Sequence, residues 1–357
     1  RRGPHKSAKE HVQFLREEFS EMILKGHWTL LPAKAVLREL QLRLSPLGVV
    51  PQRDRRPRTI CDCTFYDVNE ETQQQAPAEA MQFGKALQRL LQRIHSAHPK
   101  MGPVCLSKID IADGFYRISI RAGDIPKLAV LFPNRPLEPE LLGFPLTLPK
   151  GWKESPPWFS SATETVADLA NEALRLRSTQ PPHRLEESSE TAIAAEPDNA
   201  TINPTAPTRP VPNTTPDNHY KRPVAHWDVH VDDFIGLAQG NKWRRRTTKR
   251  ALLHVLDSVF QGLSPEDSEH RQEPALMKKM AKGDTTWATR KVVLGWLIDT
   301  VKKTIELPPH RVRQILESIQ QGQRHISTQQ WHKVLGELRS MVVAIPGGRG
   351  LFSALQE

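Results

Sequence analysis

The chain has few cysteines and no long apolar segment. Its 357 residues contain three cysteines, Cys61, Cys63 and Cys105, an odd number whose spacing fits no zinc-binding pattern. We therefore expect reduced thiols and an intracellular location, because disulfides are rare where thiols are kept reduced. No apolar run approaches the ~18 residues that a membrane helix needs, and no signal peptide is visible. These absences argue against a membrane protein and against a secreted, disulfide-stabilised one.

Acidic residues are also in deficit. There are 40 Asp and Glu residues against 50 Lys and Arg residues, which gives a formal net charge of +10. A basic chain favours an anionic partner, and nucleic acid is the commonest large one, although a merely basic protein stays about equally open on charge alone. The chain is long enough for more than one hydrophobic core.

Hydrophobic periodicity predicts both helices and strands. Helices are expected at 8–25, 79–94, 155–177, 243–260 and from 308 onward; strands are expected at 44–51, 56–63 and 104–120, the last with a short break, and hairpins at 227–238 and 291–307. Ser155 is the expected N-cap of its helix, with Pro156 in the first turn. Residues 178–223 are rich in proline and threonine and poor in large apolar residues, which predicts a disordered insertion.

Three aspartates lie at the ends of predicted strands. Asp110 ends the apolar part of one strand, and Asp232 and Asp233 lie between the two strands of a hairpin. If these strands are neighbours, the three carboxylates converge at one edge of an antiparallel sheet. Two Mg²⁺ ions ~3.5–4 Å apart can join a nucleotide to a 3′ hydroxyl, and they need such hard oxygen ligands. Alone, an Asp-Asp pair is usually a solvated turn, so the flanking segments decide the interpretation.

Five segments, in order, resemble the motifs of reverse transcriptases. They are the fingers segment at 56–69 (RPRTICDCTFYDVN), the first catalytic motif at 107–118 (SKIDIADGFYRI), the second at 148–159 (LPKGWKESPPWF), the hairpin usually written Tyr-x-Asp-Asp at 230–234 (HVDDF) and the primer grip at 293–298 (VLGWLI). The resemblance is to retrotransposon enzymes rather than to telomerase or group II intron enzymes. Since the chain begins with Arg1 and 350–357 have a helical pattern, we expect a fragment of a retroelement polyprotein.

The resemblance implies an α+β fold of the right-hand polymerase type, with an antiparallel palm sheet packed on helices. Its parts would be the fingers at 1–100, the palm at 101–290 with the insertion at 178–223, the primer-grip hairpin at 291–307, and a truncated helical thumb or connection at 308–357. The implied partners are an RNA template, a DNA primer and dNTPs, with no membrane. The oligomeric state is left open.

The resemblance also implies roles for single residues. Two Mg²⁺ ions, or Mn²⁺ in their place, would be held by Asp110, Asp232, Asp233 and the Ile111 carbonyl. The dNTP would be bound by Arg58, Ile111, Phe115, Lys150 and Gly151, and the primer end by His230, Leu294, Gly295 and Trp296. Phe115 would exclude a 2′ hydroxyl, and the alternative is a core aromatic. For Trp296 the alternative is packing within the hairpin.

Several positions keep two interpretations or depart from the motifs. Arg53 or Arg55 is either a second phosphate contact or part of a solvated basic turn. The basic run at 242–250 is either a solvated helix face or a sequence-independent phosphate contact. His230 replaces the usual Tyr, and Lys150 stands where Gln is common.

Three functions are compatible with these residues. An RNA-directed DNA polymerase is the first, because all three acids and Phe115 are present. A viral-type RNA-dependent RNA polymerase is the second, and Phe115 and the Leu-Gly-Trp of the primer grip argue against it. The third is a catalytically decayed nucleic-acid-binding remnant, which the long insertion favours.

Overall fold

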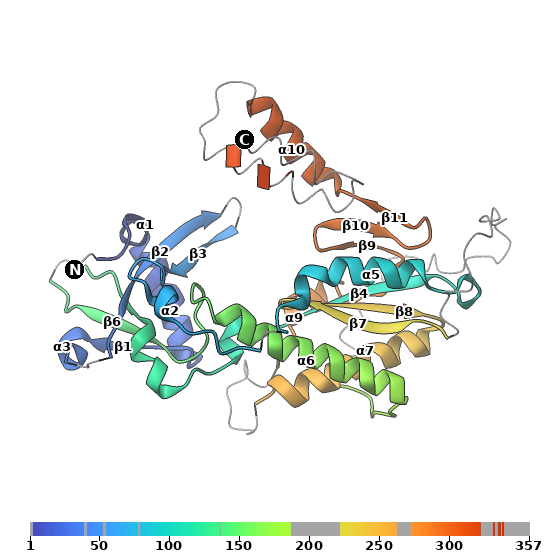
Figure 1. The fold of residues 1–357 in the computed structure, drawn as a ribbon, viewed down its shortest axis with the longest axis horizontal. Helices are drawn as coiled ribbons and strands as arrows, with labels where there is room; N and C mark the ends of the chain where they lie inside the picture. Colours follow the sequence, from blue (N-terminus) through green and yellow to red (C-terminus); the bar gives the residue numbers. More distant parts are fainter. Residues whose placement is uncertain are drawn as a thin grey trace.

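The computed structural model describes most of the chain: residues 3–38, 41–52, 55–77, 79–135, 137–186, 222–262, 273–322, 331–332, 335–336 and 338. It has a mixed α+β fold, and the strands of the described residues form three sheets (Figure 1). The order in the N-terminal sheet is β1-β6-β5-β2-β3, in the acid-bearing sheet β4-β8-β7, and in the C-terminal sheet β11-β10-β9. No helix in the described part of the chain is both long and apolar enough to span a membrane.

The N-terminal sheet is covered by the first helices of the chain. Its strands are β1 (Trp28–Pro32), β2 (Leu44–Gln52), β3 (Arg55–Cys61), β5 (Ala129–Leu131) and β6 (Leu141–Pro145); the helices are α1 (Lys6–Glu10), α2 (Val12–Leu24) and α3 (Ala33–Val36). Leu15, Phe19 and Met22 follow helical spacing along α2 and are buried in one core with Leu47 and Val130. The predicted helix at 8–25 is therefore present, interrupted at His11.

The acid-bearing sheet lies between two helical layers. Its strands are β4 (Val104–Asp110), β7 (Ala225–His230) and β8 (Asp233–Gln239); α5 (Ala86–His95) covers one face, and α6 (Ser155–Leu176) and α7 (Lys242–Phe260) cover the other (Figure 1). Ile109 and Phe234 are buried in the core with α6 and α7, whereas Leu106 and Ile235 are buried in the core with α5. This alternation has the period of two that a strand dictates, and it fixes the register of the sheet.

The C-terminal sheet shares a hydrophobic core with α5 and with one face of the acid-bearing sheet. It contains β9 (Arg290–Val293), β10 (Trp296–Asp299) and β11 (Thr304–Glu306), so the hairpin expected at 291–307 has a third strand. Helix α9 (Met277–Ala281) precedes it and α10 (Pro309–Gly322) follows it. The other described helices are α4 (Val68–Glu71) and the 3₁₀ helices η1 (Gln82–Lys85), η2 (Pro99–Met101), η3 (Gly114–Arg117), η4 (Ala122–Asp124) and η5 (Pro126–Leu128).

Three predicted elements differ from the structure. The strand expected at 104–120 ends at Asp110, and η3 follows it, because Arg117 turns back and donates hydrogen bonds to the carbonyls of Ala112 and Phe260. The helix expected at 79–94 starts only at Ala86, after η1. Ser155 is not an N-cap, since it lies inside the first turn of α6 and its hydroxyl donates to the Pro149 carbonyl at 2.7 Å.

The predicted boundary between fingers and palm at residue 100 does not separate two structural units. Strands β5 and β6, which belong to the range expected for the palm, complete the N-terminal sheet by pairing with β2 and β1. Helix α5, from the range expected for the fingers, packs on the acid-bearing sheet. The chain therefore crosses three times between the two sheets, which periodicity alone cannot reveal.

The start of the expected disordered insertion is packed. Residues 178–186 lie along α7, where His183, Leu185 and Glu186 are buried. His183 Nε2 lies 2.9 Å from Asp257 Oδ2, and Arg250 pairs with Glu186. Ion pairs with α7, together with the burial of Leu185, thus order this segment. Residues 187–221 lie outside the described residues.

Candidate active site

The three aspartates meet at one end of the acid-bearing sheet. Asp110 on β4 pairs directly with Asp233 on β8, and Asp233 pairs with His230 on β7. Directly opposed residues in antiparallel strands have Cα atoms about 4.5–5.5 Å apart. The Ile111 N–H donates to the Asp232 carbonyl at 3.2 Å, which closes the same edge. Asp110 and Asp233 are thus neighbours at this edge, with Asp232 next to them in the hairpin, and the convergence of the three carboxylates on a metal stays a prediction.

The hairpin tip is held in a strained turn. Only Val231 and Asp232 connect β7 to β8, and Val231 has φ 60°, in the left-handed region that β-branched residues avoid. Its partly buried side chain packs against the core beneath the sheet. The core contact offsets the strain and keeps Asp232 at the tip.

The electrostatics of the acids favour a cation. Burial, followed by the neighbouring Asp233, raises the pKa of Asp232; burial also raises the pKa of Asp233, and Lys108 and His230 oppose that rise. Asp110 is buried, and its Oδ1 has no hydrogen-bond partner. An unpaired carboxylate oxygen in a buried site is costly unless a cation compensates it.

A lysine meets this need in the structure. The Lys279 ammonium on α9 forms an ion pair with Asp110 and lies 3.9 Å from Asp233 Oδ1. Two backbone hydrogen bonds hold the segment before α9 against the end of β4 and so place Lys279 near Asp110. The Leu276 N–H donates to the Asp110 carbonyl at 2.9 Å, and the Ala112 N–H donates to the Pro274 carbonyl at 2.8 Å. Within the described residues, no three His, Cys, Asp or Glu side chains are grouped closely enough to hold a metal ion. The hard oxygen donors and the bound ammonium nevertheless fit a cation site.

Among the predicted nucleotide-binding residues, Lys150 is a cation whose charge acts on Asp232. Its ammonium is 5.3 Å from the centroid of the Tyr116 ring. Burial and then Arg58 lower the pKa of Lys150, while Glu18, Asp232 and Asp113 oppose that change. Arg58 is exposed on β3. The two cations are therefore close enough to influence each other beside the acidic edge.

Gly151 has a structural reason to be glycine that the sequence did not suggest. Its φ is 115°, and a Cβ there would lie 1.9 Å from the Cys61 carbonyl oxygen. The Cys61 N–H donates to the Lys150 carbonyl at 3.2 Å, so β3 runs directly against this loop. The close approach seen here is between backbone and backbone, and it fixes Lys150 relative to Arg58.

The predicted sugar-contact residue lies on the edge of a core. Phe115 is in η3, not on a strand, and meets Phe159 edge-on with ring centroids 4.8 Å apart. It is only partly buried. Both of its interpretations, the sugar contact and the core aromatic, thus remain compatible with its place beside Asp110.

The residues expected at the primer end lie on two elements. His230 meets Phe83 edge-on at 5.3 Å. Leu294 and Gly295, with φ 50° and 79°, form the turn between β9 and β10, and Arg311 of α10 donates to the Gly295 carbonyl at 3.1 Å. Trp296 is buried in a core that contains Val293 and Ile298 of the hairpin as well as α5, which is compatible with the alternative of packing within the hairpin.

The remaining basic candidates fall into two groups. Arg53 lies outside the described residues, and only the backbone of Arg55 is described. In the run at 242–250, Arg244 donates to the Pro223 carbonyl, Arg245 contacts Cys105 Sγ at 3.8 Å and Arg250 pairs with Glu186. These arginines bond to the protein itself, so the run is not simply a solvated face.

One comparison with known proteins gives a match. No protein-family model matches the chain, and no curated protein does. A solved structure of the foamy viral protease–reverse transcriptase in complex with double-stranded DNA matches with a TM-score of 0.54 and 13% identity. The fold is similar to that of a viral reverse transcriptase. The match covers 96% of this chain and 42% of the viral one, so the chain spans less than half the length of that structure.

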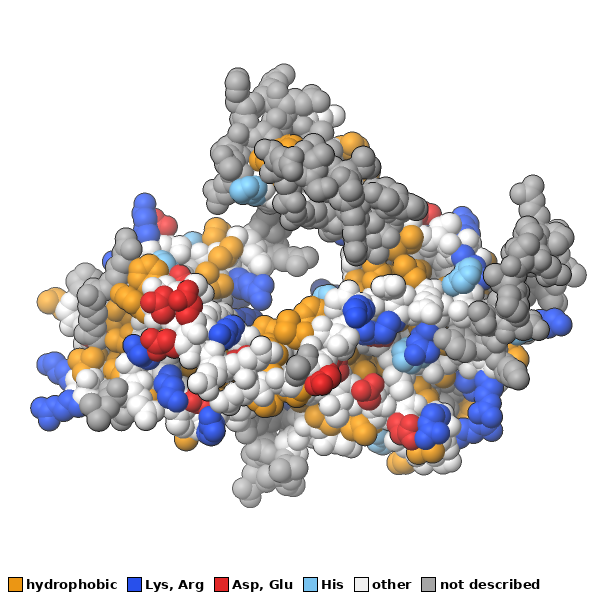
Figure 2. Space-filling view, in the orientation of Figure 1, with side chains coloured by type: hydrophobic (Ala, Val, Ile, Leu, Met, Phe, Trp, Pro, Cys, Tyr) orange, Lys and Arg blue, Asp and Glu red, His pale blue; other side chains and the backbone are white. Residues whose placement is uncertain are grey.

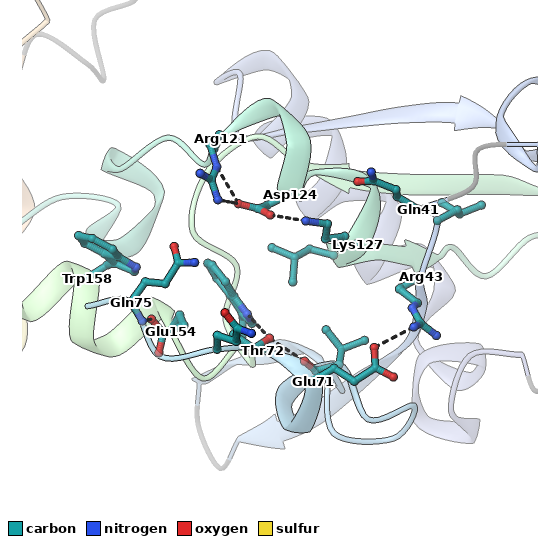
Figure 3. A pocket seen from close by; sticks show the side chains of 15 residues that line it. Gln41, Arg43, Glu71, Thr72, Gln75, Arg121, Asp124, Lys127, Glu154 and Trp158 are labelled. Atoms are coloured by element: carbon teal, nitrogen blue, oxygen red, sulfur yellow. Dashed lines mark hydrogen bonds and ion pairs between the residues drawn. The ribbon is translucent and has the colours of Figure 1, made fainter. Parts of the chain in front are cut away.

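A pocket of about 710 Å³ is lined by residues of four segments, among them Arg43, Thr72, Asp124 and Glu154 (Figure 3). Its charged groups bond to one another: Asp124 accepts from Arg121 and Lys127, and Arg43 pairs with Glu71. Trp152 donates to the Thr72 hydroxyl at 3.1 Å. None of the predicted site residues lines this pocket. Its size therefore does not make it the reaction site, and the acidic edge is the better candidate.

Proposed function

We propose that the chain is the polymerase part of a retrotransposon reverse transcriptase, an RNA-directed DNA polymerase that transfers a nucleotide from a dNTP to a primer 3′ hydroxyl. The observation that carries this proposal is the register that brings Asp110 beside the Asp232–Asp233 hairpin. It occurs in a chain whose fold is similar to that of a viral reverse transcriptase. The basic charge of the chain also suits a nucleic-acid partner.

In this proposal the carboxylates of Asp110, Asp232 and Asp233, with the Ile111 carbonyl, hold two Mg²⁺ ions. When bound, the ions stabilise the attacking and the leaving oxygens. Lys279 would then have to leave Asp110, because its ammonium and divalent cations held on the same carboxylates would repel one another. The N-terminal sheet would act as fingers, the acid-bearing sheet as palm, β9–β11 as primer grip and α10 as the start of the thumb.

The chain's own cations and aromatics would orient the substrates. Arg58 and Lys150 would bind the triphosphate, since paired cations suit phosphate oxygens. Phe115 would lie under the sugar and exclude a 2′ hydroxyl. The RNA template and DNA primer would reach the acids from the hollow that Figure 2 shows between the N-terminal part and the C-terminal sheet.

Primer extension tests this function. Purified protein with poly(rA), oligo(dT), Mg²⁺ and dTTP should extend the primer. Asp232→Ala and Asp110→Asn should each lose at least about a hundredfold in rate, because each removes a carboxylate that would hold the Mg²⁺ ions. Asp168→Asn, an exposed position on α6, is the matched control and should keep full activity. A folded wild type without incorporation, or an Asp232→Ala variant as active as Asp168→Asn, would show the proposal to be wrong.

The same assay separates the alternatives. An RNA-dependent RNA polymerase would prefer rNTPs to dNTPs. A nucleic-acid-binding remnant would bind the primer–template without extending it, and Asp110→Asn would leave that binding unchanged. The Lys279–Asp110 ion pair is the observation that favours the remnant, because it neutralises a carboxylate that catalysis needs.

A further inference from the structure

The turn that follows Asp110 carries a contact with a distant part of the chain. Between Asp110 and Phe115, Asp113 has φ 62° and Gly114 has φ 49°, and η3 begins there. The left-handed conformation is uncommon for residues other than glycine, and aspartate tolerates it better than most. Such a turn persists where its surroundings hold it in place.

On one side the turn is held by the N-terminal part. Lys25, directly after α2, donates to both carboxylate oxygens of Asp113, at 2.9 and 3.1 Å. His27 Nε2 lies 3.9 Å from Asp113 Oδ2. Burial alone would raise the pKa of Asp113, but His27 and Lys25 outweigh burial and lower it. The carboxylate is therefore held as an anion between two side chains that lie 88 and 86 residues earlier.

His27 also connects to the predicted triphosphate site. Its ring stacks on Tyr116, with centroids 5.1 Å apart and planes at 21°, and His27 is buried. The Lys150 ammonium also contacts the Tyr116 ring. One short segment after α2 thus contacts the turn at Asp113 and, through Tyr116, Lys150.

On its other side the turn is anchored independently. Arg117 donates to the carbonyls of Ala112, Phe260 and Glu273, all on the side of the acid-bearing sheet. Loss of the Lys25 contact therefore leaves the turn attached there. Without the Lys25 contact, the turn is held less firmly in its position relative to the N-terminal sheet, which carries Arg58.

We propose that Lys25 and His27 are positioning residues that clamp the turn at 113–116, so that Phe115 is held at the sugar and Lys150 at the triphosphate of the incoming nucleotide. This inference rests on the proposed function. The clamp does not touch Asp110, Asp232 or Asp233, which the sheet register positions. Its loss therefore affects nucleotide binding and sugar choice more than the rate at saturation.

The test compares Lys25→Met with Lys25→Arg in steady-state primer extension. Lys25→Met should raise the KM for dTTP about tenfold with little change in kcat, and lower the preference for dTTP over UTP about fivefold, since a charge-assisted bidentate contact is lost. Lys25→Arg should restore both values, because a guanidinium can still donate to both oxygens of Asp113. Asp113→Asn combined with Lys25→Met should add little to Lys25→Met alone.

Arg16→Met is the matched control. Arg16 lies on α2, the helix that Lys25 follows, and forms a partly buried ion pair with Glu138. We expect Lys25→Met and Arg16→Met to have similar melting temperatures. Only Lys25→Met should change the KM for dTTP and the sugar preference. If Lys25→Met changes them no more than Arg16→Met does, the clamp is overturned while the polymerase stands. A wild type without dTTP incorporation would overturn the proposed function and the clamp together.

Discussion

Lys279 is a cation that the structure places on the acidic edge, and it sets a competition with metal. Its ammonium pairs with Asp110 and lies close to Asp233. Lys279→Met removes this competitor and leaves the buried Asp110 carboxylate uncompensated, so divalent ions should bind more tightly, by about tenfold. Loss of the electron paramagnetic resonance signal of free Mn²⁺ measures this without any activity assay. Lys278→Met, at the exposed neighbouring position, should bind Mn²⁺ as the wild type does; equal affinities for the two variants would contradict the competition.

Gly151 gives a second prediction for a single residue. Gly151→Ala should destabilise the protein by more than about 2 kcal/mol, because the new Cβ meets the Cys61 carbonyl oxygen and alanine is strained at φ 115°. The urea midpoint of unfolding measures the change. Gly84→Ala, where a Cβ meets nothing within 4 Å and φ is not positive, is the control and should differ little from the wild type. A Gly151→Ala variant as stable as Gly84→Ala would mean that the loop and β3 do not approach as described.

At this scale, the sequence predicts the residues that belong to periodic elements and misses those that act from turns. Asp110 and Asp233 could be located because apolar alternation identifies their strands and so their ends. Lys279 and Lys25 could not, because each lies at or after a helix and reaches its partner across 169 or 88 positions of chain. The left-handed conformation of Asp113, the partner of Lys25, also corresponds to no pattern in the sequence.

At the scale of elements, residues 178–186 and α7 form one unit through ion pairs. Asp257 accepts from Arg184 and lies beside His183. Burial would raise the pKa of Asp257, but Arg184 and His183 outweigh burial and lower it. A carboxyl group whose pKa is lower in the folded than in the unfolded state contributes to folding stability. This contribution is complete at pH values above the unfolded pKa, about 3.9, and it is lost as the pH falls through the folded pKa.

Asp257→Asn should therefore lower the free energy of unfolding by about 2 kcal/mol at pH 7, as expected for a charge-assisted bond in a partly buried site. The difference from the wild type should be constant at neutral pH and should narrow only below about pH 4. Urea unfolding at several pH values measures it. Glu172→Gln, in the exposed Glu172–Arg175 pair of α6, should have little effect at any pH. A pH-independent deficit in Asp257→Asn would mean that the carboxylate charge is not what holds the segment.

Elements are predicted well where burial is one-sided and poorly where polar contacts decide. Strands β2, β3, β7 and β8 and helices α6 and α7 have the expected positions, because each presents an apolar face to a core. The strand expected after Asp110 is replaced by η3, although residues 115–120 alternate, since Arg117 bonds back to three carbonyls. The order of residues 178–186 was likewise not predicted, because ion pairs with α7 add to the burial of a single large apolar side chain, Leu185.

For the molecule as a whole, a hollow lies between the N-terminal part and the C-terminal sheet (Figure 2), and the acids do not line the pocket of Figure 3. Periodicity predicted the strands of each sheet but not their grouping, because β5 and β6 return to the N-terminal sheet after β4. Long-range pairing of this kind is set by which apolar faces meet, and the periodicity of a single sequence does not show it. The chain passes three times between the sheets, and this couples the turn at Asp113 to the N-terminal part.

Primer–template binding should be strongly salt-dependent if the hollow receives a duplex. The chain carries a net charge of +10, and each phosphate that a protein neutralises releases counterions. The logarithm of the binding constant therefore falls linearly with the logarithm of the salt concentration. With about six phosphate contacts, raising KCl from 50 to 200 mM should weaken binding by about a thousandfold, measured by fluorescence anisotropy of a labelled RNA–DNA duplex. Asp110→Asn should bind at least as tightly as the wild type in the absence of divalent ions, since it removes a negative charge near the duplex. An affinity that hardly changes with salt would mean that the basic residues are committed to the protein, as Arg244 and Arg250 are, and that no duplex occupies the hollow.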